Sequence, residues 1–287
     1  MLSAAYSLKG TTMAGNEGRE AAPGAGTPAV RIDTSVAHIA RVQDYWLGGR
    51  DNFAADRQAG DEAAASFPGL VASARSARSF LARTVRYLTA EQGVRQFLDI
   101  GSGIPTAGNT HEVAQAAAPD ALVVYMDNDP VVFAHARGLL ASGPHGSTAY
   151  LGTDLRDTGT VLTEAARLLD LTQPVALVLM SVLQYIPDQE DPWKIVATLL
   201  DALAPGSFLV VAHPANDIEA QVMARMAARL NELMAERVKL RSQAEVERFF
   251  RGLRLMPPGI VRVPEWRPDS AEAAARVGTM WGGAGQK

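Results

Sequence analysis

An acid and two glycines follow one another in the stretch "QFLDIGSGIPTAGNTHE", residues 96 to 112. Asp99 lies near the end of an apolar run, and Gly101 and Gly103 open the loop after it. Glycines in this position let backbone amides approach a ligand at the carboxyl end of a parallel sheet. Asp127 ends the next apolar run, in "YMDND", where an acid would accept hydrogen bonds from two ribose hydroxyls. The pattern predicts a site for a nucleoside cofactor.

Two nucleoside cofactors fit these residues, a nicotinamide dinucleotide and S-adenosylmethionine. The dinucleotide fingerprint requires a third glycine where this chain has Thr106, with a helix beginning at once to meet the pyrophosphate. Here we expect the helix to begin only near Asn109, with Glu112 completing a capping box. Asp99 also suits a cofactor that carries an ammonium and a sulfonium. The loop therefore favours S-adenosylmethionine.

Alternation of apolar runs with helical stretches indicates the fold that would position these residues. After Gly93, β-rich runs alternate with helical ones, which is typical of a parallel sheet covered by helices on both faces. The expected strands are "RQFLDI", "ALVVYMD", "TAYLGTD", "PVALVLMSVL" and "SFLVVAH", followed by two strands in "LRLMPPGIVRVPEW". The expected helices between them are "THEVAQAAA", "PVVFAHARGLLA", "GTVLTEAARLLDL" and "PWKIVATLLDAL". We expect an α/β fold with a doubly wound, mostly parallel sheet.

The remaining segments suggest the domain organisation. Residues 1–32 are rich in Gly, Ala and Pro without periodicity, and we expect a disordered leader. Residues 33–92 form a helical cap in this interpretation, with helices over Ala54 to Ser66 and roughly Val71 to Glu91. Residues 93–287 form the cofactor-binding core, with a helical insertion around 215–250. In "SQAEVERFF", Ser242 and Glu245 predict a capping box.

Composition excludes several classes of function. A net charge of −4 argues against a protein held to nucleic acid by bulk electrostatics. The chain has no cysteine, which removes disulfides, thiolate metal sites and cysteine nucleophiles, and we predict no metal site. Its first residues do not form a signal peptide, and its apolar runs are shorter than the roughly 20 residues of a membrane span. We expect a cytoplasmic protein that does not bind a membrane.

The order of these motifs resembles that of class I S-adenosylmethionine-dependent methyltransferases. The segments that carry the resemblance are "FLDIGSGIP", "YMDNDP", "TDLRD" and "LMSVLQYIPDQEDPWKIVATLLDALAPGSFLVVAH". More narrowly, "RVQDYWLGGRDNFAADR", "GNTHEVAQ" and the terminal "WRPD" and "WGG" are similar to an actinobacterial family of S-adenosyl methyltransferases. The resemblance runs from about Ser35 to Gly283. It implies a Rossmann-like core of seven strands, with an antiparallel strand near the C-terminus, and S-adenosylhomocysteine as product.

The resemblance also implies roles for individual residues. Gly101, Ser102 and Gly103 would cradle the methionine and ribose part of the cofactor, with Asp99 beside them. The ribose hydroxyls would bind Asp127, next to Asn128. The adenine would contact Asp154 through its amino group and Leu155 through its ring, and Ser181 would lie near the sulfonium.

Candidates for contact with the methyl acceptor are less specific. His213, at the end of the fifth strand, is the first candidate for a general base, and a hydrogen-bonded structural histidine is the alternative. Other candidates for contacts with substrate or cap are Tyr45, Trp46, Asn52, Asn109 and Gln184. An arginine series on the third helix is expected to form a solvated face rather than a basic site: Arg75, Arg78, Arg83 and Arg86.

The favoured function is methyl transfer to a small molecule, which needs a general base only if the acceptor is protonated. The alternatives are a cofactor-binding protein that uses this scaffold without methyl transfer and, third, a nicotinamide-dependent oxidoreductase. The acceptor atom and the oligomeric state do not follow from the sequence.

Overall fold

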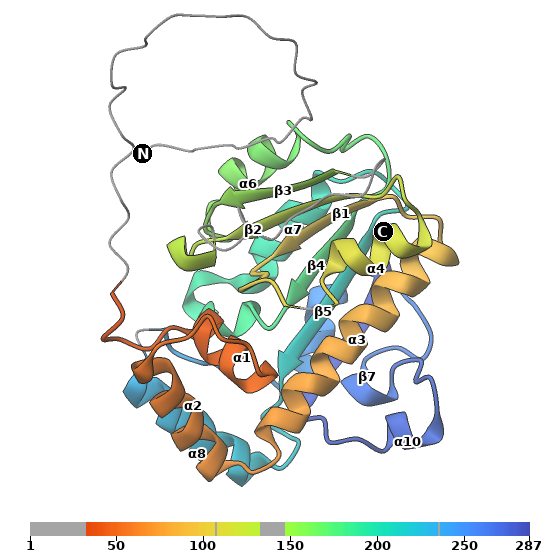
Figure 1. Cartoon of the computed structure of the whole chain (residues 1–287). Helices are drawn as coiled ribbons and strands as arrows, with labels where there is room; N and C mark the ends of the chain where they lie inside the picture. Colours follow the sequence, from red (N-terminus) through yellow and green to blue (C-terminus); the bar gives the residue numbers. More distant parts are fainter. Residues whose placement is uncertain (1–32, 107, 133–146, 235) are drawn as a thin grey trace, which may run out of the picture.

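The computed structural model describes residues 33–106, 108–132, 147–234 and 236–287 (Figure 1). The expected leader and most of the helix in "PVVFAHARGLLA" lie outside these residues. The described chain contains one mixed sheet with strand order β3-β2-β1-β4-β5-β8-β6, and β7 pairs with β8. The strands from β1 to β5 are parallel to one another, and β8 is antiparallel to β5. The doubly wound α/β fold is therefore confirmed.

The strands and helices have the following bounds. The strands are β1 Gln96–Ile100, β2 Leu122–Asp127, β3 Ser147–Gly152, β4 Ala176–Met180, β5 Phe208–Pro214, β6 Arg254–Leu255, β7 Val261–Arg262 and β8 Met280–Gln286. The helices before β4 are α1 Ile39–Leu47, α2 Ala54–Ser66, α3 Leu70–Ala90, α4 Thr110–Ala117 and α6 Thr158–Ala165. Those after it are α7 Pro192–Asp201, α8 Ala220–Leu233, α9 Gln243–Glu247 and α10 Ala271–Ala274. Short 3₁₀ turns cover Leu183–Tyr185, Asp188–Glu190, Arg248–Phe250 and Val263–Glu265.

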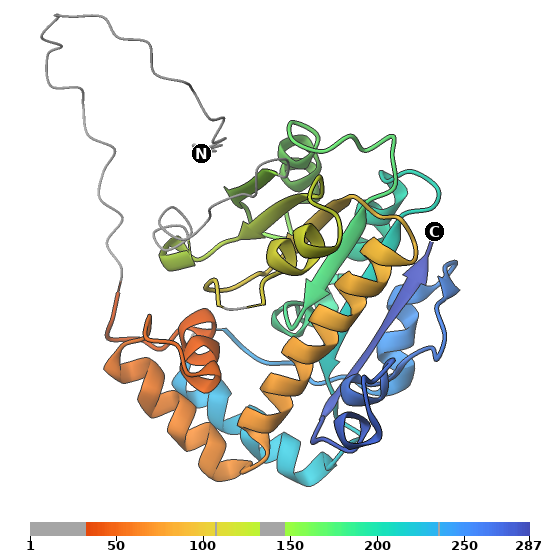
Figure 2. The same cartoon turned by 45° about the vertical axis from the view of Figure 1, so that its right-hand side comes forward.

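Two apolar cores lie on opposite faces of the sheet. Successive side chains of a strand point to opposite faces, so Phe97 of β1 joins the core beneath α3 and α4, whereas Leu98 joins the core beneath α6 and α7. Figure 2 shows α3 running along one face of the sheet. Strand order reverses between β1 and β4, and ligands of such sheets bind outside the carboxyl ends of the strands at this point.

The arginines of α3 do not form the uniform solvated face that we expected. Arg83 is buried, and its guanidinium donates to the carbonyl oxygens of Trp266 at 2.9 Å and Val263 at 2.7 Å. Phe80 packs edge-to-face against the same Trp266 ring. Arg83 therefore fixes α3 to the segment before β8, and helical periodicity alone does not reveal such a tertiary contact.

The strand that flanks β5 is not in the expected place. The two strands expected around Pro257 are only two residues long, and the long antiparallel strand is β8 near the C-terminus. A Cβ at Gly282 would lie 2.8 Å from Val263, and one at Gly283 would lie 2.6 Å from Ile260. Glycine is thus required for close packing at these positions, although glycine usually weakens a strand.

Three helices stand beside the sheet at the carboxyl ends of its strands, and we call α1, α2 and α8 the lid helices. Trp46, Ala59 and Met226 belong to their shared core, and α2 lies beside α8 in both ribbon views (Figures 1 and 2). Buried Asp56 joins the first two, because its carboxylate accepts from the backbone of His38 at 2.9 Å and pairs with Arg41 at 3.0 Å. Of the three helices in residues 33–92, α1 and α2 share a core with α8, whereas most of α3 packs on the sheet.

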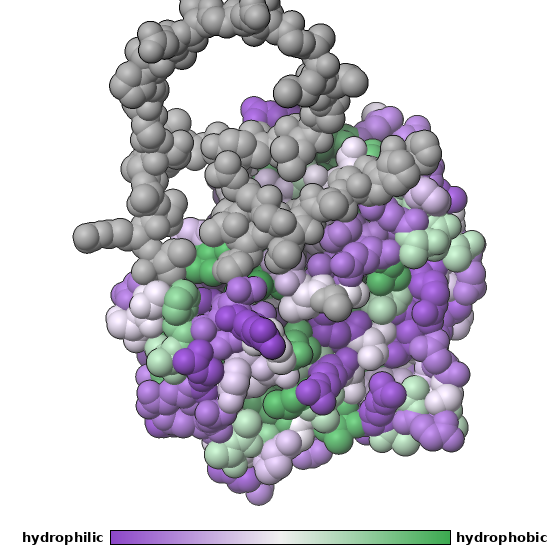
Figure 3. Space-filling model, in the orientation of Figure 1, coloured by the Kyte–Doolittle hydropathy of each residue, from purple (hydrophilic) through white to green (hydrophobic). Residues whose placement is uncertain are grey.

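The outer surface is mixed in polarity. On the face shown in Figure 3, hydrophobic residues form small groups between polar ones. Within the described ranges, the large apolar residues that are exposed are Val36, Phe53 and Val277. None of the helices that the structure describes has the length and apolar character needed to cross a bilayer.

Candidate active site

The glycine loop after β1 has the backbone that the sequence predicts. Gly101 has a φ of 74° and Gly103 a φ of 67°, which L side chains rarely adopt. A Cβ on Gly101 would lie 2.5 Å from Val182, which follows β4. Gly101 also donates its N–H to the carbonyl of Met126 in β2 at 2.7 Å. The loop therefore passes directly between the ends of three strands.

One cavity lies beside this loop, with about 740 Å³ of empty space that is partly open to solvent, and we call it the glycine-loop cavity. Most of the residues expected to bind the cofactor line it: Gly101, Gly103, Asp127, Asn128, Asp154, Leu155 and Ser181. Residues that we did not predict also line it, including Thr153 after β3, His38 at the N-cap of α1 and Gln43 within that helix. The structure thus brings together side chains from four strand ends and from the lid.

Asp127 is buried and already bonded to the backbone. Its carboxylate accepts from Gly103 N at 2.9 Å and from Asp129 N at 2.9 Å. Burial raises the pKa of Asp127, and the two backbone hydrogen bonds act in the opposite direction. Two lone-pair positions of a carboxylate remain for a ligand after these bonds.

Asp154 is more exposed and lines the same cavity. Its carboxylate accepts from the Asn128 amide at 3.2 Å and from Arg156 N at 2.9 Å. It also forms an ion pair with the Arg156 guanidinium at 3.2 Å. Asn128 therefore links the ends of β2 and β3 through a side-chain contact that the sequence did not predict.

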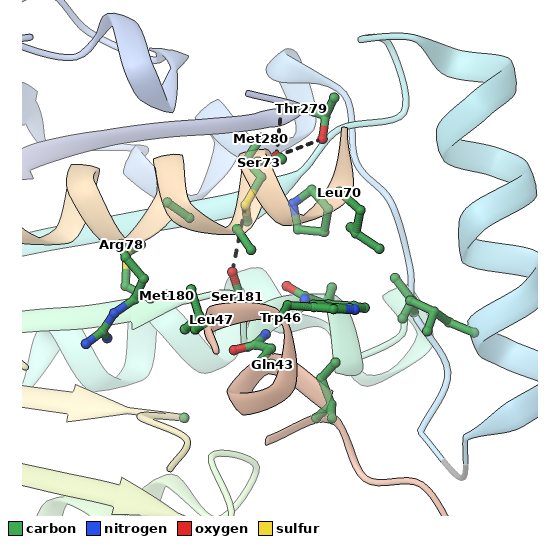
Figure 4. A pocket seen from close by; sticks show the side chains of 18 of the residues that line it. Gln43, Trp46, Leu47, Leu70, Ser73, Arg78, Met180, Ser181, Thr279 and Met280 are labelled. Carbon is green, nitrogen blue, oxygen red and sulfur yellow. Dashed lines mark hydrogen bonds between the residues drawn. The ribbon is translucent and has the colours of Figure 1, made fainter. Parts of the chain in front are cut away.

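A second cavity lies next to the first, with about 950 Å³ of empty space that is partly open to solvent, and we call it the apolar cavity. Figure 4 shows Trp46, Leu47, Leu70, Met180 and Met280 around it. Its other apolar walls are Ile39, Ala74, Ala77, Leu81, Pro214, Met223, Met226, Leu230 and Val238. Helices α1, α3 and α8, the end of β4 and the start of β8 thus line one largely hydrophobic space.

Asp99 and Arg78 bring opposite charges to the edge of the apolar cavity, where Ser102 also lies. The Asp99 carboxylate accepts from the Thr110 hydroxyl at 2.6 Å. Burial raises the pKa of Asp99 to about 6, although the Thr110 hydrogen bond and the charge of Arg78 lower it. Arg78 donates to the Asn109 side chain at 3.3 Å. This arginine is part of the site and was not predicted to be, because its spacing matches that of the exposed arginines of α3.

The two cavities meet at five shared residues: Ile39, Gln43, Gly101, Ser181 and Tyr185. Ser181 follows β4 with a φ of 54°, in the left-handed region that is unfavourable for a serine. Its hydroxyl faces Met280 Sδ at 3.9 Å (Figure 4). Strained backbone of this kind is enriched at functional sites, and here it lies at the boundary between the two cavities.

His38 ties the lid to the core at the edge of the glycine-loop cavity. Its Nδ1 lies 2.7 Å from Asp129 and its Nε2 lies 3.4 Å from Glu236. Burial alone would lower the pKa of His38, but the hydrogen bonds to Asp129 and Glu236 raise it to about 9. His38 is therefore protonated near neutral pH and bridges two acids, although we assigned it no role from the sequence.

His213 does not occupy the position expected of a general base. It is fully buried and lines neither cavity. Its Nδ1–H donates to the Pro214 carbonyl at 2.9 Å, and its Nε2 accepts from Arg241 at 2.7 Å. Burial and the charge of Arg241 lower the pKa of His213 to about 3. The alternative interpretation, a hydrogen-bonded structural histidine, describes this geometry.

The other acceptor candidates divide into two groups. Trp46 and Gln184 line the apolar cavity. Tyr45, Asn52 and Asn109 line neither cavity. Tyr45 donates to Asp61 at 2.7 Å, Asn52 donates to Asp44 at 2.8 Å, and Asn109 forms the N-cap of α4. The contact of Tyr45 between α1 and α2, the turn of Asn52 and the cap of Asn109 explain the types of these residues without a ligand.

Comparisons with known proteins identify a family and two similar structures. Residues 25–287 match the model of a family described as S-adenosyl methyltransferase. A DUF574 family protein from Streptomyces avermitilis is 43% identical, with 90% of this chain and 100% of that chain covered and a TM-score of 0.86. A protein from Thermobifida fusca is 40% identical, with 89% and 96% covered and a TM-score of 0.83.

A more distant solved structure shares the fold alone. It is an O-methyltransferase family protein from Burkholderia thailandensis, 14% identical, with 72% of this chain and 55% of that chain covered and a TM-score of 0.50. The comparison with curated proteins gave no match.

Proposed function

Because the chain belongs to the S-adenosyl methyltransferase family, whose cofactor is S-adenosylmethionine, we propose that it methylates a small molecule held in the apolar cavity. The observation that carries this proposal is the junction of the two cavities, where five residues face both spaces. A ligand of the glycine-loop cavity and a ligand of the apolar cavity would meet there. The nicotinamide alternative is not retained, because the family binds a different cofactor.

The residues present fit the nucleoside end of S-adenosylmethionine. Asp127 and Asp154 supply acceptors for ribose hydroxyls and an adenine amino group, and Leu155 supplies an apolar wall. Thr153 adds a second kind of support, since its buried hydroxyl has no hydrogen-bond partner among the described residues. A buried polar group without a partner is unfavourable, so a ligand that bonds to Thr153 would be stabilised.

The amino-acid end of the cofactor fits the charges beside the loop. Asp99 would bind its ammonium group and Arg78 its carboxylate, so that each charge of the zwitterion meets its opposite. A bound ammonium would also lower the pKa of Asp99, because an opposite charge favours the ionised form. This arrangement explains why a buried acid follows the first strand.

The bound cofactor supplies an activated methyl group, and the protein supplies position. Gln43, Ser181 and Tyr185 at the junction would orient the acceptor within about 3 Å of the methyl carbon. The lid helices would exclude water from this junction. The apolar cavity extends beyond Asp99 and Arg78 to Met223 and Met226 of α8. This further space supports methyl transfer over the alternative of cofactor binding alone, because the cofactor does not need it.

A first experiment compares cofactors by thermal unfolding and calorimetry. S-adenosylmethionine or S-adenosylhomocysteine at 100 times its Kd should add about 2.7 kcal/mol of stability, whereas NADH and NADPH should add none. Stabilisation by the nicotinamide cofactors alone would contradict the proposal.

A second experiment separates the two cavities. Ala74 lines the apolar cavity, so Ala74→Phe should fill it and abolish methyl transfer while cofactor affinity stays at the wild-type value. The matched control is Ala72→Phe, on the exposed side of the same helix. Methylation would be followed as S-adenosylhomocysteine release from a library of apolar small molecules. Equal turnover in both variants would place the acceptor elsewhere.

A further inference from the structure

The lining of the apolar cavity is rich in polarisable side chains. Four methionines surround it, Met180, Met223, Met226 and Met280, and the indole of Trp46 faces the same space (Figure 4). Trp46 Nε1 donates to the Gly60 carbonyl at 3.2 Å, which holds the ring in place. Aromatic faces attract cations, and thioethers are polarisable. These groups can stabilise a delocalised positive charge without a carboxylate beside it, since the one acid among the described lining residues, Asp99, is assigned above to the cofactor.

The cavity offers no free general base. Among its described lining residues, the titratable side chains are Asp99, Arg78 and Tyr185. Asp99 is bonded to Thr110 and is assigned above to the cofactor ammonium. Burial raises the pKa of the Tyr185 hydroxyl, so it does not act as a base near neutral pH. His38 and Glu236 line only the other cavity and face each other there.

The groups at the junction are neutral hydrogen-bonding groups. Gln43, Ser181 and Tyr185 line both cavities, and Gln184 lies beside them with its Nε2 3.3 Å from the Tyr185 hydroxyl. An acceptor positioned by these side chains meets amides and hydroxyls, not a carboxylate that could remove a proton. Its nucleophilic lone pair must therefore be available before it binds.

We propose that the methyl acceptor is an apolar aromatic compound with a weakly basic nitrogen, of the aryl amine or pyridine-type class. This inference rests on the proposed function. Such a nitrogen is neutral at working pH and keeps its lone pair. A phenol near pKa 10 would need a base, as would an alkyl amine that is protonated below about pH 10. A carboxylate would have to lose its hydration in an apolar space, which is costly.

The proposed transfer balances without a protein base. The nitrogen lone pair forms the new N–C bond as the electrons of the C–S bond return to sulfur. Positive charge therefore moves from sulfur to nitrogen, toward Trp46 and the thioethers. A pyridine-type product keeps this charge, and an aryl amine product loses one proton to water after release.

Calorimetry on the full chain with S-adenosylhomocysteine bound tests the charge preference. The probes are N-methylisoquinolinium, which mimics the charged product, and its neutral analogue methylnaphthalene. The cation should bind roughly 3- to 30-fold more tightly, the range expected of a partly desolvated cation–π contact. Trp46→Leu should abolish this preference. Trp46→Phe is the matched control, because it loses the same Gly60 hydrogen bond but keeps an aromatic face and should keep most of the preference.

Turnover with isoquinoline, naphthol and naphthoate gives the second readout. We expect N-methylisoquinolinium as the product and no methylation of the two oxygen compounds. Methylation of naphthol or naphthoate, or a wild-type protein without a preference for the cation, would overturn the inference. Either result would leave the proposed function standing if S-adenosylmethionine still binds. Loss of cofactor binding in the wild-type protein would instead contradict the proposed function itself.

Discussion

The Asp127 carboxylate accepts a hydrogen bond from the backbone N–H of Gly103 at 2.9 Å, so the acid at the end of β2 holds the loop that follows β1. One side chain thus shapes the glycine loop and faces the cavity beside it.

Asp127→Ala should therefore weaken both cofactor binding and the fold. We expect a roughly tenfold to thousandfold loss of affinity for S-adenosylmethionine, because the two charge-assisted hydrogen bonds that we propose from the ribose hydroxyls would be lost. The free energy of unfolding should fall by about 1–3 kcal/mol, since two backbone donors lose their acceptor. The affinity of Asp127→Asn for S-adenosylmethionine should lie between those of Asp127→Ala and the wild type. Asp154→Ala should lose less affinity than Asp127→Ala. Calorimetry and denaturant unfolding would measure these changes, and normal affinity in Asp127→Ala would place the cofactor elsewhere.

Asp99 should make cofactor affinity depend on pH. In the folded protein without cofactor, the pKa of Asp99 is about 6, above the ordinary 3.8. Protonation of Asp99 therefore stabilises the folded state relative to the unfolded chain. This contribution to stability is fully present below about pH 3.8 and is lost as the pH rises through about 6.

Affinity for S-adenosylmethionine should follow the opposite direction, because the ammonium site that we propose at Asp99 requires the ionised carboxylate. It should fall by roughly tenfold per pH unit below about 6. Asp99→Asn should bind weakly at every pH and lose this dependence. Calorimetry between pH 5 and 8 tests both statements, and an unchanged pH dependence in Asp99→Asn would assign the titration to another group.

His213 should matter for stability and not for chemistry. His213→Ala leaves buried Arg241 without one acceptor, and we expect a loss of about 2–4 kcal/mol in unfolding free energy. Because the pKa of His213 is lowered to about 3, its contribution is present above about pH 6.5 and is lost as the pH falls toward 3. His213→Gln should keep turnover near the wild-type value. A limb of the pH–rate profile that disappears in His213→Gln would restore the histidine as a base.

Gln43 of α1 and Asn52, between α1 and α2, allow a matched comparison of two amide side chains. Gln43 lines both cavities, whereas the Asn52 amide is bonded to Asp44 and Gly49. Gln43→Ala should lower kcat with little change in melting temperature. Asn52→Ala should lower the melting temperature by a few degrees with little change in kcat, since a buried acceptor loses a donor. The reverse pattern would show that Asn52 contacts the acceptor.

Local sequence signals predicted the elements that depend on local interactions. The helix expected over Ala54 to Ser66 has these bounds, and the capping box of Ser242 and Glu245 forms as expected. The glycine loop was also predictable, because glycines between a strand and the following helix are typical of the first turn of a doubly wound sheet. Each of these features is determined within about ten residues of the chain.

Long-range contacts explain the errors. Arg83 resembles its exposed neighbours in spacing and becomes buried only because the Trp266 carbonyl lies opposite. His213 ends a strand, as an active-site residue would, but Arg241 covers it from a distant segment. The family resemblance implied an antiparallel strand near the C-terminus, but the residues of β8 were not identified, because glycines that allow close packing also remove the usual strand signal. In each case the deciding partner is distant in sequence.

Helix α1 covers both cavities, and this affects the order in which ligands bind and leave in each catalytic cycle. Ile39 and Gln43 of α1 line both spaces, and His38 fastens the start of the same helix to Asp129 and Glu236. A displacement of α1 that uncovers one cavity therefore uncovers the other. Both products should leave in one opening, and an acceptor bound beneath a closed α1 should delay exchange of the spent cofactor. High acceptor concentrations are then expected to cause substrate inhibition.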